Sequence, residues 1–353
     1  MSSDVSSGRG TAILKDKESG GVSCLRKRRK TDVIIGRIPL LIIFASLLLT
    51  GFSIGQLYEI PFYISKGEYA IGVYSGDSPF SLAPHPEISN PVLTFRDVSD
   101  IPADFVADPF MVRENGVWYM FFEVLNRETE QGDIGLASSV DGKEWKYDRI
   151  VLDEPFHLSY PYVFEWEGEY YMVPESKSAF AVTLYKAEKF PREWRPVKTL
   201  IKGNFSDPSV FRHNDYWWIF VSETNDILRL FFSDSLQGTW HEHPGSPLVV
   251  RDARYARPGG RVIALGDTLL RLTQDCKSEY GLEVNGFLIV ELTPEKYSEV
   301  SWEGNPVLQG SGKGWNAKRM HHLDAHRIAD NLWIAAVDGW RRSVRIGWKG
   351  SKQ

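Results

Sequence analysis

Short apolar runs separated by turn residues dominate the chain from about residue 60 onward. Within these runs apolar or aromatic residues alternate with polar ones, and Gly, Asn, Asp or Pro stands between the runs. Such alternation has the period of two that is typical of half-buried strands, and no stretch of useful length after residue 60 has helical periodicity. The body of the protein is therefore predicted to be all-β.

One strand–turn–strand pattern recurs five times. Each copy begins at a polar or aromatic residue, usually before Pro, and its second strand ends near an acid. The copies begin at Asp108, Tyr160, Asp207, Arg257 and His322, roughly 50 residues apart, and the first four continue into a third and a fourth strand. Repeats of this size with four short strands predict the blades of a five-bladed β-propeller.

The two ends of the body are expected to close this ring. Residues 69–80 resemble the third strand of a blade, and residues 90–95 resemble residues 305–309 of the fourth blade. Because an open ring would leave unpaired strand edges, these N-terminal segments are predicted to complete the fifth blade, whose own second half is truncated near residues 343–348. The propeller is predicted to span residues 69–350.

A longer apolar run at residues 38–58 has a different character. It carries no charge, follows a basic cluster at residues 25–30, and is about as long as a helix that crosses the hydrocarbon layer. A cleavable signal peptide has a shorter apolar core and a shorter leader, and basic residues keep their side of a span in the cytoplasm. The sequence therefore predicts a type II protein with a cytoplasmic tail at 1–37, a single anchor, a stem at 59–68 and a luminal body.

Composition narrows the class of ligand. The chain has a formal net charge of -5 and no basic stripe in its body, so nucleic acid is not an expected partner. Aromatic residues make up 13% of the chain, and such rings both favour strands and line sugar-binding clefts. Cys24 and Cys276 are predicted on opposite sides of the membrane, so no disulfide is expected. Asn204 begins a glycosylation sequon on the luminal side.

The first residues of the five inner strands form the candidate site. In a propeller such residues surround one mouth of the central channel, so the five starting positions are expected to converge. Two carboxylates at one cavity, here Asp108 and Asp207, suit glycoside chemistry, in which one acts on water or the sugar and the other tunes it. The alternative is that each Asp only bonds amides of a neighbouring turn, an interpretation that is stronger for one Asp than for two equivalent ones.

Several motifs resemble known families. ADPF, SDPS and the five-blade period are similar to glycoside hydrolase family 43 and the invertase-levansucrase group. More specifically, FVADPF, QGDIGLA, LDEPFHLSYPYVF, MVPES, ARPGGR, TQDCKSEYG and HHLDAH resemble the amino-terminal domain of plant glucosamine inositolphosphorylceramide transferases. This resemblance covers residues 69–348 and implies a Golgi protein of glycolipid or polysaccharide assembly. The plant enzymes carry a second, carboxy-terminal glycosyltransferase domain that this sequence does not include, so a separate glycosyltransferase is an expected partner.

One position departs from the hydrolase families. Their general acid is a Glu near the start of the fourth inner strand, where this chain has Ala256 and Arg257. Without a proton donor, expulsion of a sugar leaving group loses about 100- to 10,000-fold in rate. Glu175 and Glu223, which end the second strands of their blades, are candidates to replace the donor if they reach inward. Alternatively, they bond turn backbone or pair with a nearby Arg.

Arginine and histidine residues make the predicted funnel partly cationic. Arg257, Arg261, His321, His322 and His326 all lie in the motifs of the fourth and fifth inner strands. Because Arg forms planar pairs with phosphate or carboxylate, an anionic sugar ligand such as a nucleotide sugar or an inositol phosphate is predicted. The alternative is that Arg257 only neutralises the two inner-strand Asp residues.

Further residues are candidates for substrate contact because they lie in the same motifs. They are His157, Tyr160, Gln274, Asp275, Tyr280 and Asp324. The HHLDAH segment contains natural zinc ligands, but it is interpreted as an inner strand with alternating faces, so no metal and no cofactor is predicted.

Three functions remain open on the sequence. The first is a Golgi membrane protein related to glycosyltransferases, which acts on a glycan, a glycolipid or an activated sugar, or holds the glycan for a separate transferase. The second is a family 43-like glycosidase with Asp108 as base and Asp207 tuning the acid. The third is a glycan-binding propeller without catalysis.

Overall fold

The computed structural model describes residues 62–348 continuously and, before them, residues 42–43, 45–47 and 50. The chain divides into two units, residues 1–60 and 61–353, and all strands belong to the second. The predicted cytoplasmic tail and most of the predicted anchor at 38–58 lie outside the described residues. Among the residues that are described, no helix has the length and apolar character needed to cross a bilayer.

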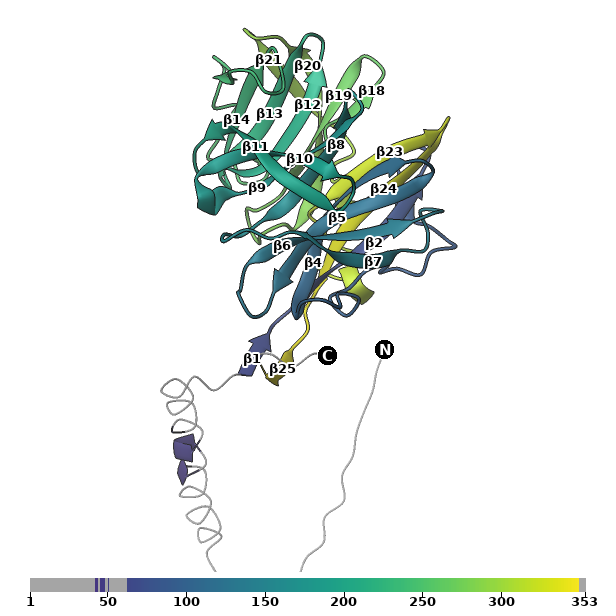
Figure 1. Cartoon of the computed structure of the whole chain (residues 1–353), viewed down its shortest axis with the longest axis vertical. Coiled ribbons are helices and arrows are strands. Elements are labelled where there is room, and N and C mark those ends of the chain that lie inside the picture. Colours follow the sequence, from purple (N-terminus) through teal and green to yellow (C-terminus); the bar gives the residue numbers. More distant parts are fainter. Residues whose placement is uncertain (1–41, 44, 48–49, 51–61, 349–353) are drawn as a thin grey trace, which may run out of the picture. The chain divides into compact units, whose positions relative to one another are not determined.

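Five antiparallel sheets follow one another as the blades of a propeller, which confirms the predicted fold (Figure 1). Blade one consists of β4 (Ala103–Glu114), β5 (Val117–Asn126), β6 (Gly132–Ser139) and β7 (Lys146–Leu152). Blade two consists of β8 (Ser159–Trp166), β9 (Glu169–Glu175), β10 (Ala181–Lys189) and β11 (Glu193–Lys202). Blade three consists of β12 (Ser206–His213), β13 (Tyr216–Thr224), β14 (Ile227–Ser233) and β15 (His241–Glu242), with β16 (Val249–Val250) also paired to β14.

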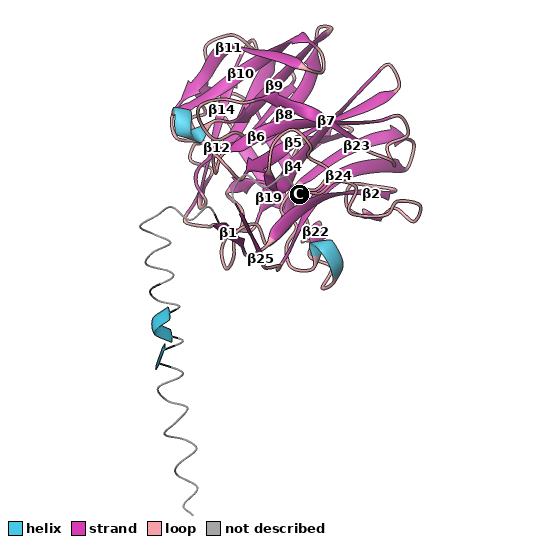
Figure 2. Cartoon of the chain, turned by 60° about the horizontal axis from the view of Figure 1, so that its bottom comes forward, coloured by secondary structure: helices cyan, strands magenta, loops and turns pink. Residues whose placement is uncertain are grey.

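The inner position of blade four is divided between two short strands. Its members are β17 (Arg257–Pro258), β18 (Ile263–Leu265), β19 (Thr268–Gln274), β20 (Glu283–Leu292), β21 (Tyr297–Ser301) and β22 (Leu308–Gln309). Both β17 and β18 pair with β19, and β22 pairs with β20. Within the described part of the chain the body contains only strands, loops and two single-turn 3-10 helices, Lys177–Ala179 and Gly314–Asn316 (Figure 2).

Blade five joins the two ends of the body, as predicted. It runs in the order β23 (Leu323–Ala329), β24 (Leu332–Arg341), β2 (Glu68–Gly76) and β3 (Ala83–Pro84). The ladder between β24 and β2 extends from Glu68↔Arg341 to Gly76↔Trp333. Because β2 occupies the free edge of β24, the C-terminal segment does not add a strand to this blade. Instead β25 (Arg345–Trp348) pairs with β1 (Phe62–Ser65) in a separate two-stranded ribbon.

The hydrophobic core lies between neighbouring blades. Each of four clusters of buried side chains combines residues of adjacent blades, so that Phe121 of β5 packs with Tyr162 of β8 and Leu270 of β19 packs with Val337 of β24. A tryptophan within or next to the outer strand of four blades packs against these clusters; these residues are Trp145, Trp194, Trp240 and Trp302. Burial of apolar area between the blades holds each inner strand against the channel.

Candidate functional site

Three inner strands share an unusual backbone conformation where they reach the channel mouth. Asp108, Tyr160 and Asp207 have φ angles of 52°, 48° and 50°, in the left-handed region, and the ladder register shifts at each of them. A bulge of this kind lifts one residue out of the ladder and re-aims its side chain. Non-glycine residues hold such angles only where the surroundings impose them, and here the same device recurs at three equivalent positions.

A group of buried, ionisable side chains converges at this mouth. We call it the mouth group, and it consists of Asp108, Glu123, Glu175, Asp207, Arg257, His321 and Asp338. At two of the bulges, an acid in the second strand of the preceding blade bonds the backbone of the bulged residue. Glu175 accepts a hydrogen bond from the backbone N–H of Asp207 at 3.1 Å, and Asp338 accepts one from the N–H of Asp108 at 3.1 Å.

Arg257 is held by carboxylates on the third-blade side of the mouth. Its Nε donates to Asp207 Oδ2 at 2.5 Å, and its second guanidinium nitrogen lies 3.4 Å from Glu175 Oε2. Gln274 donates to the same Asp207 oxygen at 2.8 Å, and Asn225 accepts from Arg257 at 2.9 Å. Of the two readings that the sequence allowed, these contacts favour neutralisation of Asp207, because the guanidinium has no free planar edge for an anion.

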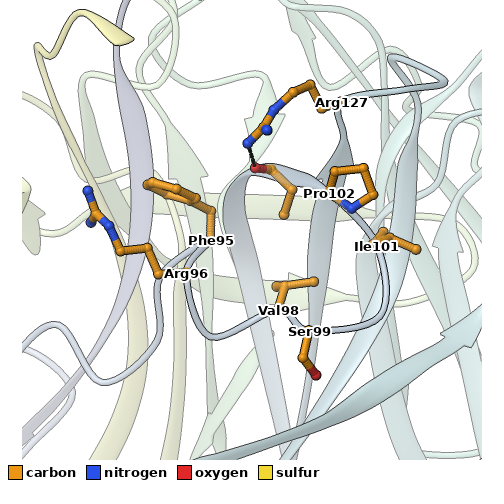
Figure 3. Close-up of a pocket in the computed structure, with 8 residues that line it drawn as sticks. Phe95, Arg96, Val98, Ser99, Ile101, Pro102 and Arg127 are labelled. Atoms are coloured by element: carbon orange, nitrogen blue, oxygen red, sulfur yellow. Dashed lines mark hydrogen bonds between the residues drawn. The ribbon is translucent and has the colours of Figure 1, made fainter. Parts of the chain in front are cut away.

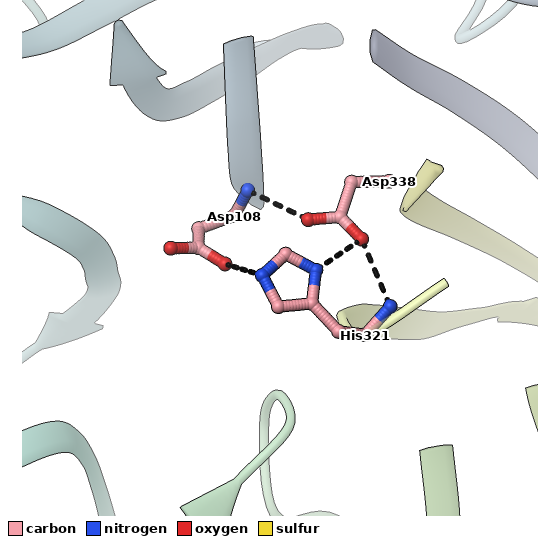
Figure 4. Close-up of side chains that lie close together, drawn as sticks. All are labelled: Asp108, His321 and Asp338. Carbon is pink, nitrogen blue, oxygen red and sulfur yellow. Dashed lines mark hydrogen bonds and ion pairs between the residues drawn. The ribbon is translucent and has the colours of Figure 1, made fainter. Parts of the chain in front are cut away.

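His321 lies on the opposite side, between two carboxylates (Figure 4). Its Nδ1 is 2.8 Å from Asp338 Oδ1, and its Nε2 is 3.5 Å from Asp108 Oδ1. The ring is flanked by Tyr69 and Tyr280, with centroid separations of 4.7 and 5.6 Å. The imidazole is therefore fixed in orientation, with Nε2 directed at Asp108.

A second set of inner-strand side chains forms hydrogen bonds between blades. The Tyr160 hydroxyl lies 2.7 Å from Ser209 Oγ and accepts from the Gly260 N–H at 2.8 Å, and Tyr160 has no exposed surface. Arg261 donates to Asp324 Oδ1 at 2.6 Å and to the Val163 carbonyl at 2.9 Å. These bonds join residues of different blades, and they already engage the Tyr160 hydroxyl and the Arg261 guanidinium.

Burial raises the proton affinity of most carboxylates in the mouth group. It raises the pKa of Asp108 and of Asp207 to about 7, partly opposed by His321 and Arg257 respectively. It raises the pKa of Glu123 well above the ordinary value, and the neighbouring carboxylates add to the effect. Burial would lower the pKa of His321, but the Asp338 carboxylate raises it to about 8. The mouth thus contains both proton donors and proton acceptors near neutral pH.

Comparison with known proteins identifies the family. Residues 64–340 match the family described as glucosamine inositolphosphorylceramide transferase 1, N-terminal. The chain belongs to this family. It is 39% identical to glucosamine inositolphosphorylceramide transferase 1 of Oryza sativa subsp. japonica over 302 residues and 36% identical to that of Arabidopsis thaliana over 303 residues. Each match covers 78% of this chain, and the chain spans about 40% of the length of these relatives. The resemblance inferred from the motifs is confirmed.

Solved structures with the same fold are glycoside-active propellers of low sequence identity. The β-1,2-mannobiose phosphorylase from Listeria innocua superposes with a TM-score of 0.54 at 14% identity, over 75% of this chain and 96% of that chain. The catalytic domain of the Coprinopsis cinerea GH62 α-L-arabinofuranosidase gives 0.52 at 14% identity, over 67% and 90%. At such identity the likeness establishes the fold alone.

Glu175 and Glu223, the two acids considered as replacement proton donors, face different sides of their strands. Glu175 reaches the mouth, whereas the Glu223 carboxylate pairs with Arg229 at 2.7 Å, and Arg229 also bonds Glu242 of the outer strand β15. The register explains the difference: Ser159 pairs with Glu175 in blade two, and Ser206 pairs with Ser222 in blade three. Ser222 therefore holds the inward position, and Glu223, one residue later, faces the other way.

Glu123 belongs to the mouth group although the sequence analysis did not select it. It lies in the second strand of blade one, three residues before the end of β5, pairs with Ala107 beside the bulge, and so occupies the position of Glu175. The signal that could have found it is the repeat itself, since VWYMFFE ends in the same acid as EYYMVPE. His157, a predicted contact residue, lies beside it: its Nε2 is 3.4 Å from Glu123 and its Nδ1 accepts from the Gly132 N–H at 2.9 Å.

The remaining predicted contact residues lie on the loop after β19 and at the start of β23. Tyr280 is 40% exposed and lies over the Arg257 guanidinium at 5.0 Å, so it offers an aromatic surface at the opening. Asp275 is buried and accepts from the Lys277 N–H at 2.7 Å, which stabilises the loop itself. Cys276 is no nucleophile near neutral pH, because burial raises the pKa of its thiol to about 11.

A separate cavity of about 190 Å³ lies at the loop before β4 (Figure 3). Its walls include Phe95, Ile101 and Arg127, and Arg127 donates to the Ala103 carbonyl at 2.6 Å. It shares no lining residue with the mouth group. Of its two arginines, Arg127 is paired with Asp104 at 3.0 Å and Arg96 lies over the Phe95 ring at 4.6 Å, so the cavity contains no convergent set of catalytic groups.

Proposed function

We propose that this protein is a Golgi-resident, carbohydrate-active propeller that takes part in the assembly of glycosyl inositolphosphorylceramide-like glycolipids or other cell-surface glycans. In this proposal residues 38–58 anchor it as a type II membrane protein, and the mouth group receives a sugar of the glycoconjugate. The observation that carries the proposal is the convergence of buried carboxylates at one propeller mouth in a chain of this family. Its relatives' names describe transferases that act with glucosamine and inositolphosphorylceramide.

The charge of the mouth group bears on the class of sugar. It contains five carboxylates against one guanidinium and one imidazole, and Arg257 and Arg261 are both already paired. We therefore replace the predicted anionic ligand with a neutral or amino sugar, whose hydroxyl or ammonium groups donate to carboxylates. Glucosamine, which the relatives' name contains, carries such an amine.

The mouth also supplies a candidate for the missing proton donor. Burial raises the pKa of Glu123 well above its ordinary value, which favours its protonated form, and Asp108 lies close enough to contribute to that shift. A protonated Glu123 beside Asp108 has the chemistry of an acid and base pair on a sugar. This observation also keeps glycoside hydrolysis as the second candidate function, with Glu123 in place of Glu175 or Glu223.

Calorimetry on the full-length chain in detergent tests the proposal. We expect glucosamine-containing glycans to bind and Asp207→Asn, which disrupts the Arg257 pairing, to weaken binding at least 10-fold. Glu242→Gln on outer strand β15 serves as the matched control and should bind like the parent. Failure of neutral, amino and anionic sugars alike to bind would refute the proposed site.

A second measurement separates catalysis from binding. We expect Glu123→Gln to keep its sugar affinity within about threefold while turnover, followed by product mass from an activated donor or an oligosaccharide, falls about 100-fold or more. Turnover from an activated donor alone supports a transferase, and release of free sugar from an oligosaccharide supports a hydrolase. Binding without turnover in the parent protein would leave a lectin-like module.

A further inference from the structure

We propose that the two-stranded ribbon of β1 and β25 docks on the lipid headgroups of a bilayer, with Ile64, Val344 and Ile346 as its apolar contact. The proposal rests on the anchor at residues 38–58 in the proposed function, and it adds a surface by which the body itself meets the membrane. The ribbon is a sheet of its own, separate from the five blades (Figure 1).

Exposed and less exposed side chains alternate along both strands of the ribbon. Ile64 pairs directly with Ile346 in the ladder, and these side chains are 53% and 72% exposed. Exposure alternates residue by residue from 341 to 347, so Val344, which is 68% exposed, lies in the same row as Ile346. A strand face toward water ordinarily carries polar residues. This row of three large apolar side chains is therefore expected to contact an apolar neighbour.

The opposite face of the ribbon is fixed to the body. The guanidinium carbon of Arg345 lies 3.7 Å from the centre of the Phe95 ring, and Arg345 also donates to the Asp104 carbonyl. The guanidinium carbon of Arg127 lies 4.2 Å from the centre of the Tyr63 ring. Cations over aromatic faces at such distances are attracted to them. The ribbon is thus held in one orientation, with the apolar row on its other face.

Positively charged residues continue the exposed row. Lys66 lies two residues after Ile64, Arg342 lies two residues before Val344, and both cations are exposed. No Asp or Glu occurs at 61–67 or 342–353 of the sequence, although the chain has a formal net charge of -5. Anionic headgroups attract Lys and Arg, and long cationic side chains keep their charge in water while apolar neighbours lie deeper. A lipid surface therefore matches both parts of the row.

The connection to the proposed anchor keeps this surface close to the bilayer. Three residues, 59–61, separate the end of the predicted anchor from the first residue of β1. An extended chain advances about 3.3–3.6 Å per residue, so in the proposed topology the ribbon begins within roughly 15 Å of the end of the span. Segments with one apolar and one polar face lie in the boundary between headgroups and acyl chains. The bilayer is therefore the occupant that we assign to this face.

Site-directed fluorescence in vesicles tests the docking. The full-length chain, with Cys24→Ser and Cys276→Ser, carries an environment-sensitive label at Ile64→Cys or Ile346→Cys and is reconstituted in phosphatidylcholine with phosphatidylserine. We expect lipids with a nitroxide near the headgroup to quench most of the emission at both positions. Val290→Cys is the matched control, because it is exposed on β20, at the opposite end of the body (Figure 1), and should stay unquenched.

Lipid charge provides a second measurement. In vesicles that contain phosphatidylserine, Lys66→Gln and Arg342→Gln should each lower the ratio of docked to undocked ribbon by about fivefold. In phosphatidylcholine alone these variants should behave like the parent, because that surface carries no net charge. Unchanged circular dichroism would show that each variant is folded.

The proposal is overturned if labels at 64 and 346 are quenched no more than the label at 290. It is also overturned if these labels are shielded from water but not quenched by the lipid nitroxide, since protein, such as a second copy of the chain, then covers the ribbon. Extraction with alkaline carbonate tests the anchor separately. A chain that is retained but unquenched refutes the docking alone, whereas a chain that is quenched on the vesicles yet extracted refutes the anchor and supports the docking.

Discussion

Burial affects the pKa values of the acids in the channel more strongly than any single partner does. Asp207 is 1% exposed and bonds Arg257 and Gln274, yet its pKa is raised because desolvation outweighs these favourable contacts. Asp324, equally buried, has its pKa lowered: burial would raise it, but Arg261 and His326 together prevail. The number of cations within reach therefore decides which buried acid stays ionised.

Asp133 shows the same effect outside the mouth and supports a pH prediction. Burial raises its pKa to about 6, and the neighbouring Asp153 adds to the shift. Because the folded-state pKa lies above the unfolded value of about 3.9, the folded state holds this proton more tightly. The ionised residue therefore costs stability once the pH has risen through 6.

We expect Asp133→Asn to raise the free energy of unfolding by about 1–2 kcal/mol at pH 7.5. The gain should shrink as the pH falls below 6 and vanish near pH 3, where the carboxyl is largely protonated in both states. Urea denaturation of both proteins across this range measures the difference. A gain that is independent of pH would contradict the assignment.

Tyr160, predicted as a substrate contact, supports a stability prediction instead. Removal of its hydroxyl in Tyr160→Phe leaves the buried Gly260 N–H without its acceptor, and we expect a loss of about 1–3 kcal/mol. Tyr216→Phe, at a half-buried ring on β13, should change stability by less than about 0.5 kcal/mol. Equal effects in thermal or urea unfolding would show that the Tyr160 hydroxyl does not join the blades.

At the scale of elements, an asparagine side chain fixes the third strand of two blades by bonding its backbone. Asn90 accepts from the Val73 N–H at 2.7 Å and donates to the Val73 carbonyl at 2.9 Å. Asn305 makes the same pair of bonds, at the same two distances, with Gly286 of β20. The similarity between residues 90–95 and 305–309 therefore includes this pair of side-chain hydrogen bonds. The pair made by Asn90 holds β2, the strand that closes the ring.

We expect Asn90→Ala and Asn305→Ala each to lower the free energy of unfolding by about 1–2 kcal/mol, since each leaves two backbone groups less well bonded. Ser89→Ala, at an exposed neighbouring position, is the control and should have little effect. Urea denaturation measures all three. If only one of the two variants lost stability, the repeated asparagine would not stabilise both blades in the same way.

At the scale of the whole molecule, closure makes the body a single cooperative ring. The N-terminal strand β2 lies beside β24, so residues more than 250 positions apart in the sequence form one ladder, from Glu68↔Arg341 onward. An unclosed ring would expose the edge of β24 for pairing with other chains.

The proposed luminal topology predicts one modification. Asn204 is exposed in the turn between β11 and β12, as an N-glycosylation site requires. We expect the full-length chain made in a eukaryotic secretory system to carry an N-glycan there, seen as a gel shift that peptide-N-glycosidase removes. Asn204→Gln should abolish the shift. An unglycosylated, membrane-bound product would place the body on the cytoplasmic side.

Much of the fold could be predicted because its determinants are local. Alternating apolar residues and the turns between them indicate strands wherever they occur, and their fivefold recurrence indicates blades. The split of the fourth inner strand into β17 and β18 was not foreseen, since RPGGR reads as one strand start. In the structure Gly260 there has φ 143° and forms a parallel bridge to Leu323, an approach so close that a Cβ would lie 1.9 Å from the Leu323 carbonyl oxygen.

The sequence by itself determined the all-β class, the five blades, the closure by the N-terminal strand and the family, because each follows from patterns that short segments carry. Only the tertiary structure decided which acids meet at the mouth. Adjacent residues on a strand face opposite sides, so pairing register placed Glu123 and Glu175 inward and Glu223 outward. The same holds for the close approach of Asp108, His321 and Asp338, which depends on where blades one and five are joined.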